Sequence, residues 1–303
     1  MRERPAIHQI IERVQLWKGR EPTVSPLSGG LTNDNFLVEV DGTRYVVRIP
    51  GLATELLAVD RGNERHNAEA AATTGVSPHV LEYLPDLSVM VLEFIDGQTM
   101  SGERLRSPEM AARMATSLQR LHGGPRFRQD FNMFRLVEYY LRIVDEQAMR
   151  IPAGFTDYMP AVHQVARAVA VNALPTVPCH NDLLAENYID DGRQLWIIDF
   201  EYGGNNGPCF ELRDTAQECA FDHELRAALC EAYFGRLDPA QLARMELFAC
   251  IADVGWTLWA AIQARISAID FDFWGWAQER WGRAVALMDS DAFAHLIGEA
   301  TAE

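Results

Sequence analysis

The amino-acid sequence predicts an α+β fold with two lobes, a small N-terminal lobe built on an antiparallel sheet and a larger, mainly helical C-terminal lobe. Strand-like alternation of apolar and polar residues is concentrated before residue 97, whereas helical spacing dominates from Pro108 onward. A short Glu-Phe-Ile-Asp-Gly segment at residues 93–97 connects the two patterns. We therefore expect one lobe at residues 1–96 and the other at residues 97–303.

The N-terminal lobe is expected to combine a hairpin, two helices and two further strands. Asp41-Gly42, a dipeptide typical of hairpin turns, interrupts a long alternating stretch. A loop that contains Gly29 and Gly30 precedes this hairpin, and Gly75 closes the second helical stretch. In chain order the expected elements are a helix to about Lys18, the hairpin at 24–51, a helix at 61–75, and strands at 79–86 and 87–96.

The C-terminal lobe is expected to be helical with one exception. Residues 107–122 and a long C-terminal region have helical spacing. Between them, the polar segment at 180–190 lies between two apolar, strand-like runs at 175–179 and 195–200. No internal repeat or low-complexity tract interrupts this order.

Composition and charge limit the kinds of partner. A hydrophobic content of 48% can fill a substantial core in a chain of 303 residues. The formal net charge of -16 disfavours nucleic acid and anionic membranes and favours a small cation. No membrane-spanning apolar run or signal-peptide core is expected, so we predict a soluble, cytoplasmic protein without a membrane partner. The oligomeric state is left open.

Two residue types are informative through their scarcity. The five cysteines are an odd number without CxxC spacing, which favours reduced, buried thiols over disulfides or a zinc site. Lys18 is the sole lysine in the chain, so no later part of the protein can use a lysine.

The polar segment contains the arrangement that a phosphotransferase needs. Asp182 is followed five residues later by Asn187, and Asp199 ends the next apolar strand. The first carboxylate would orient and deprotonate an attacking hydroxyl, while Asn187 and Asp199 would bind Mg²⁺ through oxygen atoms. The ordinary structural explanation is a polar turn whose side chains bond their own backbone. The occurrence of all three at this spacing favours the catalytic interpretation.

The motifs HNDxxxxN at residues 180–187 and IDFEY at 198–202 resemble those of the choline/ethanolamine kinase and aminoglycoside phosphotransferase group. The resemblance implies a two-lobed protein-kinase-like fold that uses ATP and Mg²⁺. Residues 1–96 would then form the nucleotide-binding lobe, and residues 97–303 the catalytic and acceptor-binding lobe. His180 and Asn181 would brace the catalytic loop by hydrogen bonds.

The resemblance also implies a set of nucleotide-binding residues. Arg48 would take the phosphate-binding role of the lysine in protein kinases, with Glu64 as its partner; for each, a solvated surface charge is the alternative. The glycine pair would allow close approach to phosphate oxygens, although such a pair is also common in tight turns. The expected nucleotide-binding residues are Gly29, Gly30, Thr32, Asn33, Arg48, Glu64, Glu93, Phe94 and Ile95.

The segment at 253–281 resembles the aromatic box that encloses a quaternary ammonium in choline/ethanolamine kinases. A trimethylammonium ion donates no hydrogen bonds and is bound by ring faces, each contact worth ~0.5–2 kcal/mol. Trp256, Trp259 and Trp276 match the box, and Trp256 and Trp259 would share one helix face. Aromatic residues at this spacing also commonly belong to a core, and we assign Trp274 and Trp281 no ligand role.

Residues 210–223 contain a second part of the expected acceptor site. The resemblance places a carboxylate near the cation at Glu218 and an aromatic position at His223. Two departures occur, since Glu211 and Arg213 stand where the choline kinases commonly have aspartate and glycine, and His223 replaces the aromatic ring. These changes leave the identity of the amine open.

Together these observations predict an ATP-dependent kinase that phosphorylates the hydroxyl of choline or a close amino alcohol. Asp182 would act both as catalytic base and as a substrate-binding residue. The alternatives are a kinase for ethanolamine, thiamine or an aminoglycoside, or a catalytically silent relative that binds nucleotide or amine. Intact Asp182, Asn187 and Asp199 oppose the silent relative, and the tryptophans oppose an aminoglycoside.

Overall fold

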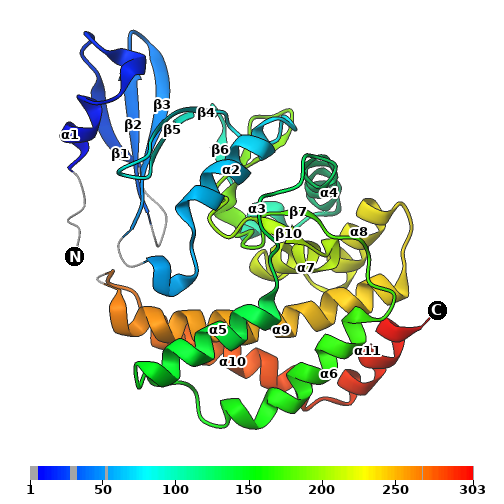
Figure 1. Cartoon of the computed structure of the whole chain (residues 1–303). Coiled ribbons are helices and arrows are strands. Elements are labelled where there is room, and N and C mark those ends of the chain that lie inside the picture. Colours follow the sequence, from blue (N-terminus) through cyan, green and yellow to red (C-terminus); the bar gives the residue numbers. More distant parts are fainter. Residues whose placement is uncertain (1–5, 28–32, 52–53, 268, 303) are drawn as a thin grey trace.

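The computed structural model describes residues 6–27, 33–51, 54–267 and 269–302, and confirms the two-lobed α+β fold (Figure 1). A five-stranded antiparallel sheet of order β1-β2-β3-β5-β4 forms the N-terminal lobe. The predicted hairpin turns at Asp41 and Gly42, which both have positive φ. The strands are β1 (Thr23–Leu27), β2 (Asp34–Val40), β3 (Thr43–Ile49), β4 (Val80–Leu84) and β5 (Val89–Glu93).

Short helical elements cover this sheet. The expected first helix is divided into α1 (Ile7–Ile11) and a 3₁₀ turn, η1 (Gln15–Trp17), which pack apolar side chains on the sheet. The second helix, α2 (Arg61–Ala72), follows the 3₁₀ turn η2 (Thr54–Leu57). The Asp60 carboxylate caps α2 by accepting hydrogen bonds from the amides of Gly62 and Asn63. This cap fixes the first turn of α2, which carries Glu64.

Small strands surround the polar segment. β6 (Gln98–Thr99), β8 (Tyr188–Asp190) and β9 (Leu195–Ile197) form one sheet, and β7 (Val177–Cys179) pairs with β10 (Gly204–Asn206). β7 and β9 lie within the two strand-like runs that the sequence predicted, whereas β6, β8 and β10 were not expected. A Cβ atom on Gly97 would lie 2.7 Å from the Asp190 carbonyl oxygen, so glycine is required where the chain crosses β8. The 3₁₀ turn η4 (Ala185–Asn187) lies within the polar segment and leads into β8.

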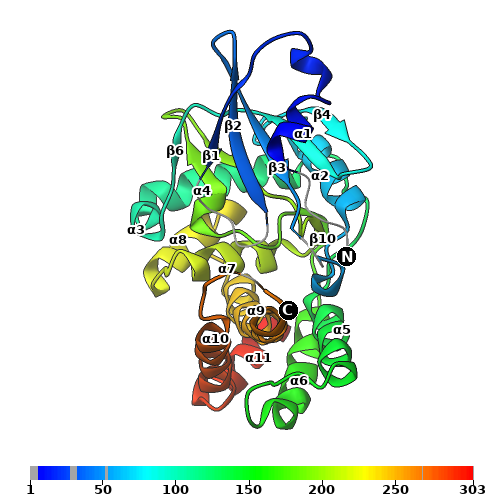
Figure 2. The same ribbon diagram turned by 90° about the vertical axis from the view of Figure 1, so that its left-hand side faces the viewer.

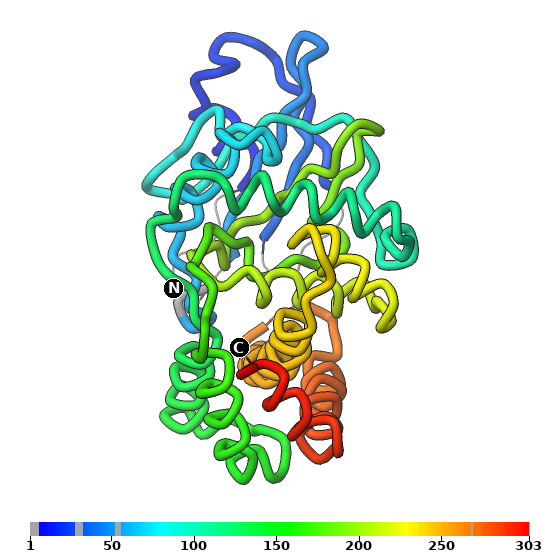
Figure 3. The backbone as a smooth tube through the Cα atoms, turned by 90° about the vertical axis from the view of Figure 1, so that its right-hand side faces the viewer, coloured from blue at the N-terminus to red at the C-terminus, as the bar shows by residue number. Residues whose placement is uncertain are grey.

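Helices form the rest of the C-terminal lobe. The long helix α9 lies between α10 on one side and α5 and α6 on the other (Figure 2), and α11 packs along α9 and α6 (Figure 3). The helices are α3 (Gly102–Leu105), α4 (Pro108–His122), α5 (Met133–Glu146), η3 (Phe155–Tyr158), α6 (Met159–Ala170), α7 (Pro208–Glu218), α8 (His223–Phe234), α9 (Pro239–Ile266), α10 (Phe273–Met288) and α11 (Asp291–Thr301).

Helix α9 corrects one expectation. Its length and composition would allow it to cross a membrane, although no such segment was expected. Within the protein, 89% of the most apolar 18-residue stretch of this helix is buried, because α5, α7, α10 and α11 surround it. Its apolar character is therefore that of a core helix. The five cysteines are free and buried, as expected.

Arg244 joins three helices at the base of this lobe. Its side chain on α9 is buried, and its guanidinium donates hydrogen bonds to the carbonyls of Val169 (3.1 Å), Ala300 (2.8 Å) and Val171. These carbonyls belong to the C-terminal ends of α6 and α11, where helices leave acceptors unsatisfied. A cation at these ends also complements the helix dipoles.

We expect Arg244→Ala to lower the free energy of unfolding by about 2–4 kcal/mol, because the two buried carbonyls of Val169 and Ala300 and the partly buried carbonyl of Val171 lose their donor. Urea denaturation followed by circular dichroism measures the change. Arg236→Ala is the control, since the Arg236 side chain is 79% exposed, and it should change stability by less than ~0.5 kcal/mol. Equal effects of the two substitutions would contradict the proposed role of Arg244.

Candidate active site

Two cavities meet where the lobes face each other. The cleft cavity, of about 340 Å³, lies between the N-terminal sheet and the other lobe, where β8 and the residues that follow β9 line it. The tryptophan cavity, of about 430 Å³, lies deeper in the helical lobe. Asn187 and Asp199 line both cavities and therefore stand at their junction.

The cleft cavity has apolar walls and a charged end. Val46, Met90 and Leu92 line it from the sheet, and Ile189 and Ile198 line it from the other lobe. The connecting segment contributes Glu93, Phe94 and Ile95, while Arg48 and Glu64 supply charge. Such a cavity suits a flat aromatic ring that carries an anionic group.

The segment from His180 to Asp182 is held rigidly by its own side chains. His180 is buried, its Nε2 contacts the Ile198 carbonyl at 2.8 Å, and its Nδ1 accepts from the Asp182 amide at 3.2 Å. These contacts require a neutral imidazole with the proton on Nε2. Burial accordingly lowers the pKa of His180.

Asn181 ties this segment to the turn after Asp199. Its φ is +69°, and its Nδ2 atom lies 3.1 Å from the carbonyls of Cys179, Tyr202 and Gly204. Asparagine tolerates the left-handed region better than most residues, and its amide secures the strained conformation. The expectation that His180 and Asn181 brace the loop agrees with these contacts.

Two buried carboxylates on α7 complete the bracing, and the sequence interpretation missed their role. Glu211 accepts hydrogen bonds from the amides of His180 (2.6 Å) and Asn181 (2.7 Å), and Asp214 accepts from the Leu183 amide at 2.8 Å. Burial opposes ionisation of Glu211, but its interactions with His122 and His180 and its backbone hydrogen bond from Asn181 outweigh burial and lower its pKa. Glu211, one of the departures from the family pattern, thus supports the loop directly.

Asp182 is left facing the tryptophan cavity. Its backbone carbonyl accepts a hydrogen bond from Asn187 Nδ2 at 2.9 Å, which fixes the loop between them. Burial raises the pKa of Asp182 well above its usual range, and the nearby carboxylates of Glu201, Asp199 and Glu218 raise it further. A raised pKa makes Asp182 a better proton acceptor than an ordinary aspartate.

A buried cluster of five charged residues joins the lobes at the junction of the cavities. Arg48 on β3 binds Glu64 on α2 (2.9 Å) and contacts Asp199 directly. Arg61 binds Glu64 (2.6 Å) and Glu201 (3.1 Å). Burial opposes ionisation of Asp199, but the charge of Arg48 outweighs burial and lowers its pKa. We call Arg48, Arg61, Glu64, Asp199 and Glu201 the charge cluster.

The donor atoms at the junction fit Mg²⁺. Asp199 offers a carboxylate, and the Asn187 amide nitrogen is engaged with Asp182, so its oxygen is the atom left for a cation. Carboxylate oxygens of Glu64, Asp199 and Glu201 also lie within 4.8 Å of one another. Hard oxygen ligands of this kind suit Mg²⁺. Glu201 is a candidate ligand that the sequence interpretation did not assign.

Aromatic side chains form the wall of the tryptophan cavity opposite Asp182. Trp256 and Trp259 lie on α9 and Trp276 on α10, and neighbouring rings meet edge to face, with centroids 6.4 Å apart for Trp256–Trp259 and 5.7 Å for Trp259–Trp276. Tyr202 and Phe271 complete the wall. The Tyr202 hydroxyl accepts from Trp259 Nε1 at 2.7 Å, which fixes both rings.

Glu218 lines the same cavity and is paired with Arg280 on α10. The two groups form a bidentate ion pair, with nitrogen–oxygen distances of 2.8 Å in both contacts. Arg280 also lies over the Trp276 ring, with Cζ 3.8 Å from the ring centroid. Sequence reasoning could not find Arg280, because an arginine within a helix has no motif that distinguishes it.

The structure brings most of the predicted residues to the two cavities but not all of them. His223 is exposed at the first residue of α8 and is not among the lining residues, because α7 ends at Glu218, the residue of this segment that reaches the cavity, and His223 lies beyond the following turn. Asn33 is buried and donates to Glu201 at 3.0 Å. Gly29, Gly30 and Thr32 lie outside the described residues.

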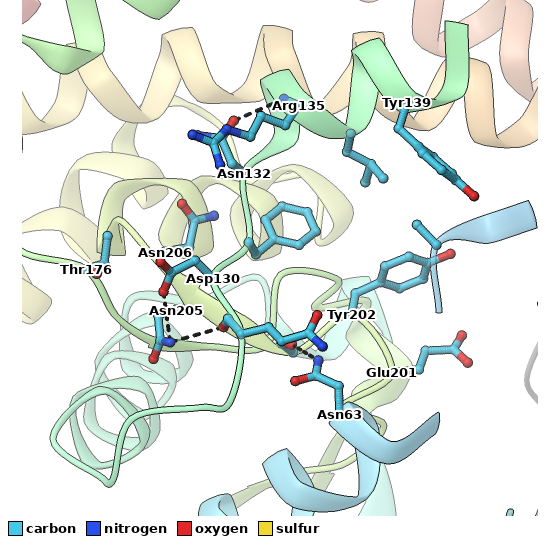
Figure 4. Close-up of a pocket in the computed structure, with 15 residues that line it drawn as sticks. Asn63, Asp130, Asn132, Arg135, Tyr139, Thr176, Glu201, Tyr202, Asn205 and Asn206 are labelled. Carbon is cyan, nitrogen blue, oxygen red and sulfur yellow. Dashed lines mark hydrogen bonds between the residues drawn. The ribbon is translucent and has the colours of Figure 1, made fainter. Parts of the chain in front are cut away.

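A third cavity, of about 440 Å³, lies behind Glu201 and Tyr202 (Figure 4). Hydrogen bonds on its floor anchor the chain after Asp199: Asn63 Nδ2 donates to the Gly203 carbonyl at 2.9 Å, and Asn205 Nδ2 donates to Asp130 at 3.0 Å. Tyr202 separates this cavity from the tryptophan cavity, since it lines both. The chain that follows Tyr202 is therefore fixed by polar contacts.

Comparison with known proteins finds relatives that are choline kinases, ethanolamine kinases or members of their family. A solved choline/ethanolamine kinase family protein from Mesorhizobium loti is 32% identical, covers 97% of this chain and 98% of its own, and has a TM-score of 0.85. The solved choline kinase LicA from Streptococcus pneumoniae is 24% identical over 92% of this chain and 98% of its own, with a TM-score of 0.79. Ethanolamine kinase 1 of Mus musculus is 27% identical over 88% of this chain and 84% of its own.

The family model described as choline/ethanolamine kinase matches residues 24–231, more than half of the chain. This match covers the charge cluster and the braced loop that carries Asp182. The predicted resemblance is thereby confirmed. The chain belongs to the choline/ethanolamine kinase family, enzymes that phosphorylate the hydroxyl group of choline or ethanolamine.

Proposed function

We propose that this protein transfers the γ-phosphate of ATP to the hydroxyl group of choline. The observation that carries the proposal is the position of Asp182, which faces a cavity walled by three tryptophans and adjoining the cleft cavity. A quaternary ammonium held against the rings would keep its hydroxyl within the same cavity as the carboxylate. Kinases of this kind work mainly by positioning and charge stabilisation.

The remaining residues receive roles from their positions. The cleft cavity binds adenine between its apolar walls, against the segment from Glu93 to Ile95. Arg48, fixed by Glu64, binds phosphate oxygens, as do the amides of the loop that includes Gly29, Gly30 and Thr32. Asn33, which donates to Glu201, remains a proposed nucleotide-binding residue. Asn187 and Asp199 would hold Mg²⁺, with Glu201 as a third candidate, and the bound ion would offset the negative charge of the phosphates.

Asp182 accepts the proton of the hydroxyl as oxygen attacks phosphorus in line, and no covalent enzyme intermediate is required. Its raised pKa follows from burial among carboxylates and suits this role. We further propose that residues 1–96 form the nucleotide-binding lobe, that residues 97–303 form the catalytic and acceptor-binding lobe, and that the protein works in the cytoplasm. Ethanolamine is the second candidate acceptor, because Glu218 places a carboxylate in the cavity.

We expect Asp182→Asn to reduce kcat by about 10²–10⁴-fold, because the base for the hydroxyl proton is lost. ADP release from ATP and Mg²⁺ is measured with choline, ethanolamine, thiamine and an aminoglycoside as acceptors, and ATP binding is measured by calorimetry. ATP affinity should be nearly unchanged. Asp145→Asn, at an exposed position on α5, is the matched control. Unchanged turnover in Asp182→Asn would remove Asp182 from the mechanism.

We expect Trp276→Leu to raise the KM for choline about tenfold while leaving the KM for ATP unchanged, because one cation–π contact is lost. Trp274→Leu is the control. Trp274 lies on the same helix, stacks on Arg150 with 3.7 Å between Cζ and the ring centroid, and does not line the cavity. Parallel changes in the two variants would show that the aromatic wall does not bind the acceptor.

We expect Asp199→Asn to abolish the dependence of nucleotide affinity on Mg²⁺, because a neutral amide is a weaker ligand for this cation. Binding of ADP is measured by calorimetry with and without Mg²⁺, for the wild type and for the Asp145→Asn control. Both should bind ADP more tightly with the ion present. A variant that retains the full Mg²⁺ effect would exclude Asp199 as a metal ligand.

A further inference from the structure

Arg280 is the one cation among the described residues that line the tryptophan cavity. It arises from α10 and its side chain is 3% exposed. Both carboxylate oxygens of Glu218 accept from its guanidinium at 2.8 Å. The same guanidinium lies over the ring of Trp276. A buried bidentate pair thus occupies the carboxylate that would otherwise meet the acceptor.

Most of the other carboxylates around this cavity are already bound by another side chain or needed for the reaction. Asp199 is bound by Arg48, and Glu201 is bound by Arg61 and Asn33. Asp182 is needed at the hydroxyl end. Glu186 is exposed and lines the side shared with the cleft cavity. Glu218 is therefore the carboxylate best placed to receive an ammonium held against Trp276, and Arg280 already holds it.

Primary and quaternary ammonium ions respond differently to such a pair. A primary ammonium has three N–H donors, which lose water on binding and need oxygen acceptors in return. A trimethylammonium has no donor and requires ring faces and diffuse negative charge. A carboxylate that is already bound by an arginine has fewer acceptor sites left for the N–H donors of a primary ammonium. A trimethylammonium ion loses little by this, because it donates no hydrogen bond.

We propose that the Arg280–Glu218 pair sets the acceptor preference of this enzyme, excluding primary ammonium and admitting quaternary ammonium. Arg280 does so by occupying Glu218 and by holding the Trp276 ring in place. The inference rests on the proposed function, since it concerns the amine end of the same substrate. Arg280 is a specificity-determining residue at the amine end of the acceptor.

The surroundings of Arg280 make this idea testable by substitution. Arg280 also contacts buried Asp253 at 3.4 Å, but Asp253 is bound more closely by Arg283, at 2.6 and 3.1 Å. Removal of Arg280 therefore leaves Asp253 paired, frees Glu218 and removes the cation that lies over the Trp276 ring. Arg283→Gln is the matched control, because it removes the other arginine on Asp253 without touching the cavity.

The experiment measures kcat/KM for choline and for ethanolamine in the wild type, Arg280→Gln and Arg283→Gln. The wild type should prefer choline. Arg280→Gln should raise the ethanolamine-to-choline ratio about tenfold or more, because the freed carboxylate accepts hydrogen bonds from a charged donor. The ratio cancels the general effect of losing one positive charge. Arg283→Gln should leave the ratio unchanged, and the KM for ATP should stay constant throughout.

Glu218→Gln decides the question independently, including the case in which Arg280→Gln does not fold. Because Arg280 already occupies Glu218, the loss of this carboxylate should lower kcat/KM for choline and for ethanolamine to a similar extent. The ethanolamine-to-choline ratio should then stay within about threefold of the wild-type value. In Arg280→Gln/Glu218→Gln the gain for ethanolamine should disappear. A selective loss of ethanolamine in Glu218→Gln would show that Glu218 binds ammonium directly, which overturns the proposal.

The outcomes separate this inference from the proposed function. Choline turnover with an unchanged ratio in Arg280→Gln removes the inference and leaves the kinase assignment intact. A wild type that prefers ethanolamine overturns the inference and the choice of choline together. A wild type that binds ATP but phosphorylates neither amine overturns the proposed function, and the inference falls with it.

Discussion

The buried charge cluster at the junction of the lobes is the interaction on which the rest of the site depends. Arg48 belongs to the sheet, Glu64 to α2, and Asp199 and Glu201 to the helical lobe, so one set of ion pairs fixes three elements at once. Removing one member of a buried pair leaves an uncompensated charge, which is strongly destabilising. The relative position of the two cavities is therefore coupled to these pairs.

The charge cluster also has an excess of negative charge, since it contains two arginines and three carboxylates. Burial raises the pKa of Glu201, and the neighbouring charge of Asp199 raises it further. An excess of negative charge in a buried position favours a cation close to Asp199. The same residues that hold the lobes together are thus suited to a metal ion, which gives the structural and the functional roles a common physical cause.

The aromatic wall shows why core and ligand interpretations of the tryptophans are compatible. Trp256 is 4% exposed and Trp259 is 5% exposed, so both pack in the helical core. The part of each ring that stays uncovered, together with Trp276, nevertheless lines the cavity. A ring fixed by packing on one side loses little entropy when a ligand contacts the other, so burial prepares the wall for binding.

The sequence by itself determined the two-lobed α+β fold, the order of most of its elements and the candidate residues Asp182, Asn187 and Asp199, because periodicity and short motifs are local properties of the chain. Only the tertiary structure decided that Glu211 supports the loop, that His223 lies outside the cavity, and that Arg280 holds Glu218. The last two partners are 62 residues apart. A contact of this kind depends on how α7 and α10 pack, and no local pattern records it.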